Sequence, residues 1–260
     1  MVWKMIKRAY GFVDASRGFY LKLRKTLEEL GCVVSKHDPA MYIFHDDEGE
    51  VDGLILTHVD DLLYGSGSVQ FEEKVMKPLK EIFTFGSKEE ADFKYVGMQV
   101  TQQGNAIKVT HDKYIEALEV PYEIPEDEDG DVLGEENQEL FRSMVGKIGW
   151  VANNSRPDLS YDSVVLSTKL GNADVKDFKL AIKIMKKMKL ETTEMRFVNL
   201  GPIEEWTLEG HGDSGFKSLP DKISSCGGQV VVVSNKKMGL RCVVNWRSRK
   251  LKRCRSFGCE

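Results

Sequence analysis

Apolar residues recur with two different periods along this chain of 260 residues, which predicts a protein of mixed helices and strands. The helical period predicts helices over residues 14–31, 68–83, 138–152, 159–170 and 175–190, with a short helix from Asp112. Strand-like runs cover residues 41–44, 51–59, 95–101, 106–110, 206–212, 228–233 and 240–246. We expect Pro78 to kink the second helix, and Val230 to Val233 to form a strand buried on both faces. The order predicts an α+β fold, with an antiparallel sheet and helices on one of its faces.

Two adjacent carboxylates, Asp60 and Asp61, interrupt the apolar pattern at the end of the run 51–59. Ionised carboxylates are costly to bury without partners. One interpretation is a solvated hairpin turn, because Asp favours turns. The other is a cation site, since Mg²⁺ binds a few carboxylate oxygens together with substrate phosphates, and two metals can clamp a phosphoryl transfer. These residues alone leave both interpretations open.

Composition indicates a globular intracellular protein with one large domain or two small ones. The five cysteines are odd in number and contain no Cys-x-x-Cys pair, so we expect reduced thiols, with neither a disulfide framework nor a zinc site. The N-terminus is too charged for a signal peptide, and no apolar run is long enough to span a bilayer. We therefore expect neither secretion nor membrane insertion.

The net charge of −4 conceals an uneven distribution. Residues 123–136 hold eight acids and no Lys or Arg, and without them the chain would carry +4. The total charge therefore does not exclude a phosphate-bearing partner. The acidic segment is expected to be a linker or surface loop. It fails as a calcium loop because Val132 and Gln138 stand where Gly and Glu are required.

Basic residues gather in two places. The lysines of the helix expected over 175–190 are typical of a solvated face, with phosphate tracking as the alternative: Lys179, Lys183, Lys186, Lys187 and Lys189. Nine further basic residues follow without an acid between them: Lys236, Lys237, Arg241, Arg247, Arg249, Lys250, Lys252, Arg253 and Arg255. Such a band neutralises phosphates, although a localisation signal or a solvated loop would have the same composition.

Seven motifs occur in one order, at residues 9–20, 38–42, 58–61, 95–98, 141–146, 156–159 and 246–252. In that order they resemble the pol polyproteins of copia-type retrotransposons, from the palm of reverse transcriptase to the start of ribonuclease H. The run His58-Val59-Asp60-Asp61 is similar to the family's Tyr-Val-Asp-Asp box. The resemblance covers almost the whole chain. It implies a partial palm over 1–120, an acidic linker with helical thumb and connection over 121–203, and the N-terminal part of a ribonuclease H-like domain over 204–260.

The resemblance also implies a role for individual residues. Asp60 and Asp61 would bind Mg²⁺ or Mn²⁺ and activate a primer 3′-hydroxyl against the α-phosphate of a nucleotide. Asp213 and Glu260 would be metal-binding catalytic carboxylates of ribonuclease H. Contacts with the nucleic acid would come from His58, Tyr95, Gly97, Met98, Arg247, Arg249, Lys250 and Lys252.

The departures from the family pattern are informative as well. The family's third polymerase carboxylate lies upstream of the palm helix, and residues 1–13 contain no acid. The fingers and the later ribonuclease H carboxylates are also missing, and His58 stands where the family has Tyr. We therefore expect a truncated, inactive or nearly inactive RNA-directed DNA polymerase. The alternatives are a non-catalytic nucleic-acid-binding relic and an unselected reading frame without a stable product.

The expected partners follow from the same resemblance. They are an RNA/DNA primer–template duplex and other parts of the pol polyprotein, without a membrane. The expected location is a cytoplasmic retrotransposon particle, with nuclear entry.

Overall fold

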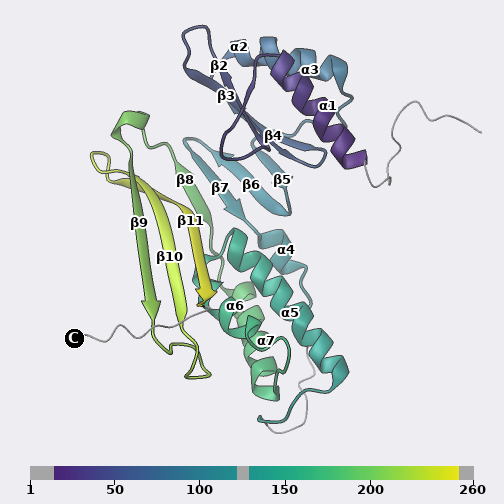
Figure 1. Ribbon diagram of the computed structural model, residues 1–260, viewed down its shortest axis with the longest axis vertical. Coiled ribbons are helices and arrows are strands. Elements are labelled where there is room, and N and C mark those ends of the chain that lie inside the picture. The colour runs from purple at the N-terminus through teal and green to yellow at the C-terminus, as the bar shows by residue number, and fades with distance from the viewer. Residues whose placement is uncertain (1–14, 122–128, 252–260) are drawn as a thin grey trace, which may run out of the picture. The chain divides into compact units, whose positions relative to one another are not determined.

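The computed structural model describes residues 15–121 and 129–251 and divides the chain into two compact units, which meet in sequence at Glu89 and Glu90 (Figure 1). Each unit mixes helices with antiparallel strands. The predicted α+β class is confirmed at this level. The division into palm, thumb and ribonuclease H-like parts stays a prediction. No helix among the described residues is long and apolar enough to cross a membrane.

The first unit is a four-stranded sheet of order β1-β2-β3-β4 with helices before and after it. Its elements are α1 (Ala15–Glu29), β1 (Val33–Val34), β2 (Met41–His45), β3 (Val51–His58), β4 (Asp61–Ser66), α2 (Val69–Phe71), a π-helical segment (Glu72–Met76) and α3 (Lys77–Ile82). The helix α1 ends at Glu29, and the chain turns away at Gly31, whose φ of +89° suits glycine. There Gly31 N donates to Glu28 O and Cys32 N to Leu27 O, which satisfies two free carbonyls.

The core of this unit lies between the helices and one face of the sheet. Leu27, Ile55 and Leu79 are fully buried there, and Phe71 is 1 % exposed. Gly53 lies under the Phe71 ring: a Cβ on it would come within 2.2 Å of Phe71 Cδ2. Burial alternates along β3, so this close packing fixes which of its side chains point away from the helices.

The second helix of the pattern is not a single helix kinked by Pro78, and that prediction was wrong in detail. Ser68 caps its start, because Ser68 Oγ accepts a hydrogen bond from Gln70 N at 3.0 Å. The helix then widens into the π-helical segment, and Pro78 lies in the first turn of α3. The missing N–H of proline is tolerated in the first turn of a helix. The change from α-helical to π-helical hydrogen bonding occurs before Pro78, in the segment Glu72–Met76.

The second unit contains two more antiparallel sheets, of order β5-β6-β7-β8 and β11-β10-β9. Its strands are β5 (Asp92–Tyr95), β6 (Met98–Gln103), β7 (Ala106–Thr110), β8 (Met195–Val198), β9 (Thr207–Gly215), β10 (Cys226–Asn235) and β11 (Leu240–Lys250). Its α-helices are α4 (Asp112–Glu116), α5 (Glu135–Asn154), α6 (Ser160–Ser167) and α7 (Val175–Leu190), and two 3₁₀ turns cover Pro157–Leu159 and Ile203–Glu205.

Several expectations for this unit are corrected. The run 95–101 is not one strand, because a turn at Val96 and Gly97 separates β5 from β6. The strand β8 was not predicted, and the helix expected to reach residue 170 ends at Ser167. The four valines of β10 are only half-buried: α6 packs against β11, and an open groove lies between this helix and the sheet at Val230.

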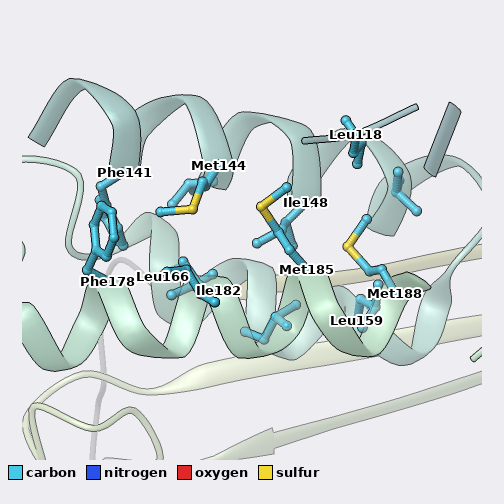
Figure 2. Close-up of a cluster of buried hydrophobic side chains, with 14 of the residues drawn as sticks. Leu118, Phe141, Met144, Ile148, Leu159, Leu166, Phe178, Ile182, Met185 and Met188 are labelled. Carbon is cyan, nitrogen blue, oxygen red and sulfur yellow. The ribbon is translucent and has the colours of Figure 1, made fainter. Parts of the chain in front are cut away.

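The helices α5 and α7 form the main core of the second unit. In Figure 2, Phe141 of α5 lies against Phe178 of α7, and both side chains are fully buried. Arg156 joins the ends of these helices: it is 1 % exposed, forms two 2.9 Å hydrogen bonds with Asp158, and donates at 2.7 Å to Glu191 O. This core holds α5 and α7 rigidly, so the exposed faces of both helices are well defined.

Candidate active site and nucleic-acid interface

The two adjacent carboxylates lie at the tip of the β3–β4 hairpin. His58 pairs with Asp61 across the ladder, which leaves Val59 and Asp60 as a two-residue turn. Val59 has a φ of 56° and is 65 % exposed. A β-branched residue is rare in this left-handed region, and such a conformation costs about 1–3 kcal/mol. The hairpin register therefore holds the backbone beside Asp60 in a strained form.

Both carboxylates are exposed, and among the described residues neither has a hydrogen bond or ion pair. No group of three or more His, Cys, Asp and Glu side chains suited to a metal occurs in the described ranges. Two free carboxylates fit Mg²⁺ or Mn²⁺ nonetheless, because such ions take one or two carboxylates and complete their shell with water and substrate phosphates. His58 is exposed on the strand opposite Asp61.

A second tight hairpin carries the predicted primer-contacting residues. Tyr95 pairs with Met98, and Val96 and Gly97 form the turn, with φ values of 47° and 80°. Two positive φ values are typical of a type I′ turn. The ring of Trp150 lies 3.5 Å from the position that a Cβ on Gly97 would take. The structure thus brings Tyr95, Gly97 and Met98 together and seats them on α5.

Sequence reasoning missed Trp150. It is 39 % exposed on the solvent face of α5, one and two turns after the exposed Gly146 and Arg142. An aromatic residue four positions after a glycine on a polar helix face was the available signal. The ring is supported from below by His111, whose centroid lies 6.1 Å away.

His111 is 1 % exposed, and its Nδ1 lies 2.6 Å from Ser155 Oγ. Burial lowers the pKa of this imidazole below its ordinary value, so the ring beneath Trp150 is neutral at neutral pH. The support of Trp150 is therefore an aromatic contact without charge.

Asp213 occupies an exposed position on β9, opposite Gly228 of β10. Its Oδ1 accepts a hydrogen bond from Ser214 N at 2.7 Å. It borders an open groove of about 520 Å³, between Tyr161 of α6 and Trp246 of β11. Glu260 lies outside the described residues, so its role as a metal-binding carboxylate of ribonuclease H stays a prediction.

Arg247 and Arg249 are exposed two positions apart on β11 and therefore on the same side of the sheet. They line a second groove, of about 460 Å³, together with Gly212 and Gly227. Neither arginine has an acidic partner within the described ranges. Lys250 is 3.9 Å from Asp221, and the predicted Lys252 lies outside the described residues. The arginines form an accessible basic surface of the second unit.

Comparison with known proteins gives two matches. A family model described as reverse transcriptase (RNA-dependent DNA polymerase) matches residues 1–126. A Saccharomyces cerevisiae protein assigned to transposon Ty5-1, YCL074W, is 23 % identical over 265 residues, which cover 96 % of this chain and 82 % of the yeast protein. No solved structure matches significantly.

Proposed function

We propose that Asp60 and Asp61 hold the divalent metal of nucleotidyl transfer. The premise is that residues 1–126 belong to the reverse transcriptase family of retrotransposon pol proteins. The observation that carries this proposal is the β3–β4 tip, where two exposed carboxylates lie on a strained two-residue turn without a protein partner in the described ranges. The chain is proposed to be of the copia type. The earlier resemblance to a pol polyprotein is confirmed by both matches.

The hairpin contributes position and negative charge. Its ladder holds Asp60 and Asp61, consecutive in the chain, at the exposed tip of the hairpin, where a cation can reach both residues. A bound Mg²⁺ or Mn²⁺ would supply Lewis-acid stabilisation of the transferring phosphate. His58 is proposed to contact the primer terminus, because it is exposed opposite Asp61 and its imidazole offers a hydrogen bond to sugar or phosphate.

Three features of the second unit support binding of a primer–template duplex. The half-buried turn of the β5–β6 hairpin lies against Trp150, whose 39 % exposed ring offers a face on which a sugar or base can stack. Gly146 has open space at its missing Cβ, which lets a nucleic-acid backbone approach the helix closely. Arg247 and Arg249 add positive charge on β11 for phosphate contacts.

The C-terminal part is proposed to be ribonuclease H-like, with Asp213 as a metal ligand. Its support is the resemblance of the motifs together with the exposed position of Asp213 on a strand edge beside an open groove. The location in a cytoplasmic particle with nuclear entry is likewise a proposal.

A polypeptide limited to these 260 residues should extend a primer at most very slowly. The family resemblance implies three polymerase carboxylates. Asp60 and Asp61 would be two of them, and residues 1–13 contain no acid that could be the third. Loss of one metal ligand costs orders of magnitude in rate, because the metals stabilise most of the developing charge. This polypeptide would then bind duplexes without copying them.

Primer extension on an oligo(dT)-primed poly(A) template with Mg²⁺ or Mn²⁺, alongside a duplex-binding assay, tests the proposal. We expect duplex binding with little or no extension. Robust extension that disappears in Asp60→Ala but not in Asp46→Ala would support Asp60 as a metal ligand. It would overturn the expectation that the 260-residue polypeptide is inactive. Robust extension that survives Asp60→Ala would overturn the metal role, and no duplex binding even at low salt would overturn the nucleic-acid function.

A further inference from the structure

The helix α7 exposes a row of lysines that the proposed active site and duplex surface do not use. Lys176, Lys179, Lys183 and Lys186 are all exposed and recur three or four positions apart, so they share one side of the helix. We refer to these four residues as the lysine row. At a rise of 1.5 Å per residue, the row is about 15 Å long.

Part of the lysine row carries uncompensated positive charge. Among the described residues, neither Lys183 nor Lys186 has an acidic partner. The only acid within α7, Asp177, is buried: its side chain closes the capping box with Asp174 at the start of the helix and lies 3.3 Å from Lys169. The row is therefore able to attract an anion from outside the protein.

The other end of the lysine row already binds a carboxylate. Asp129 Oδ1 accepts a hydrogen bond from Lys179 Nζ at 2.6 Å, and Lys176 N donates to Asp129 O at 3.1 Å. The neighbouring ammonium of Lys179 holds the pKa of Asp129 below its ordinary value. Asp129 belongs to the acidic run of residues 123–136. The folded chain thus already places one of its own carboxylates, that of Asp129, on the lysine row.

The composition of this helix face favours a polyanion over a protein partner. Protein interfaces have a core of apolar side chains. Along α7 the exposed positions before the last residue are lysines, and the exposed apolar side chain of the helix, Leu190, lies at its very end with 84 % exposure. Lysine ammonium groups act as flexible point charges, which suits phosphate contacts without sequence preference.

We infer that the lysine row binds the phosphate backbone of a nucleic-acid duplex, and that Asp129 competes with the phosphates for Lys179. Along one strand a duplex places a phosphate every 3.4 Å of its axis, so the row spans about four of them. The inference rests on the proposed nucleic-acid function and adds a second binding element to it. The surface of the β5–β6 hairpin and Trp150 would position the duplex, and the row would hold its backbone.

Fluorescence anisotropy with a labelled RNA/DNA hybrid duplex, measured from roughly 50 to 200 mM salt, tests this inference. Each neutralised phosphate contributes about 0.9 to the slope of log affinity against log salt. The double variant Lys183→Gln/Lys186→Gln should therefore lower the slope by about 1.8 and the affinity about tenfold. The matched control Lys25→Gln/Lys36→Gln, which removes two exposed lysines of the first unit, should change neither.

The variant Asp129→Asn should raise affinity severalfold, because it releases Lys179 for a phosphate. If wild-type protein binds no duplex, the proposed function itself fails. If wild-type protein binds and Arg247→Gln/Arg249→Gln weakens binding while the lysine variant does not, only the lysine row is refuted. If Lys183→Gln/Lys186→Gln loses affinity for the duplex and for polyglutamate to the same extent, the lysine row is a site for acidic protein segments, and its assignment to nucleic acid is overturned. Circular dichroism and thermal melting confirm that each variant is folded.

Discussion

Two pairs of adjacent aspartates flank the strand β3: Asp46 and Asp47 at the turn before it, and Asp60 and Asp61 at the turn after it. The two pairs differ in their hydrogen bonds and ion pairs. At the β2–β3 turn, Asp46 Oδ1 accepts hydrogen bonds from Glu48 N and Glu50 N, both at 2.9 Å. Asp47 forms a 2.7 Å ion pair with Lys74. At the β3–β4 turn, Asp60 and Asp61 have no such partner among the described residues. The first pair stabilises its turn, whereas the second is available to a ligand.

The backbones of the two turns differ as well. The left-handed residue of the β2–β3 turn is Gly49, with a φ of +89°, and that of the β3–β4 turn is Val59. Glycine adopts this conformation without a steric cost, while valine is strained there. Strain that the surrounding ladder maintains is common at functional sites. An aspartate pair alone is therefore weak support for a metal site, and its hydrogen bonds and backbone distinguish the two cases.

The largest effect should follow from a change in the middle of β3. Gly53→Ala would push a Cβ into the Phe71 ring, and overpacking of this kind costs about 1–3 kcal/mol. Urea unfolding of the first unit should show a loss near the upper end of that range. Gly65→Ala, where nothing lies within 4 Å of the added Cβ, is the control. Equal stability of the two variants would refute the packing of β3 on α2.

Substitution in the two aspartate pairs should change the unfolding free energy by clearly different amounts. Asp46→Ala removes an acceptor of two backbone hydrogen bonds and should destabilise the protein by about 1–2 kcal/mol. Asp60→Ala removes no protein contact and should leave the unfolding free energy within about 0.5 kcal/mol of the wild type. Chemical denaturation measures both. A larger loss in Asp60→Ala than in Asp46→Ala would contradict the assignment of structural and functional turns.

Exchanging the left-handed residues tests the backbone difference. Gly49→Ala has no steric neighbour within 4 Å but a positive φ, and should cost about 1 kcal/mol. Val59→Gly relieves strain, although glycine loses more chain entropy on folding, so the net gain should be about 0.5–1 kcal/mol. Thermal melting should shift in opposite directions for the two variants. A destabilised Val59→Gly would argue against strain at the candidate site.

The smallest effect concerns pH. The Lys74 ammonium holds the pKa of Asp47 below its ordinary value in the folded protein. The stabilisation from this pair is therefore present above the unfolded pKa of about 3.9 and is lost as pH falls through the lower folded value. In Lys74→Gln the pKa of Asp47 should rise, and the two proteins should become equally stable in strong acid. Carbon-detected NMR titration of the carboxyl groups measures the shift.

The sequence pattern predicted those features that depend on local periodicity. The helices α1, α5 and α7, the strands β2 and β3, and the adjacency of Asp60 and Asp61 all follow from residues close together in the chain. The missed features depend on distant contacts. The strand β8 exists because Met195–Val198 pairs with β7, and Trp150 gains its importance from its contact with Gly97. The split at Gly97 and the strain at Val59 are set by ladder register, which composition does not reveal.

The metal site is the central claim, and Mn²⁺ titration of the isotopically labelled 260-residue protein, followed by NMR, tests it most directly. Paramagnetic broadening should appear first at the amide signals of residues 58–62 and should leave the Asp46 and Asp47 turn unaffected at the same Mn²⁺ concentration. It should disappear in Asp60→Asn/Asp61→Asn and persist in Asp46→Asn/Asp47→Asn. Equal broadening at both turns, or broadening that survives the loss of Asp60 and Asp61, would contradict the account.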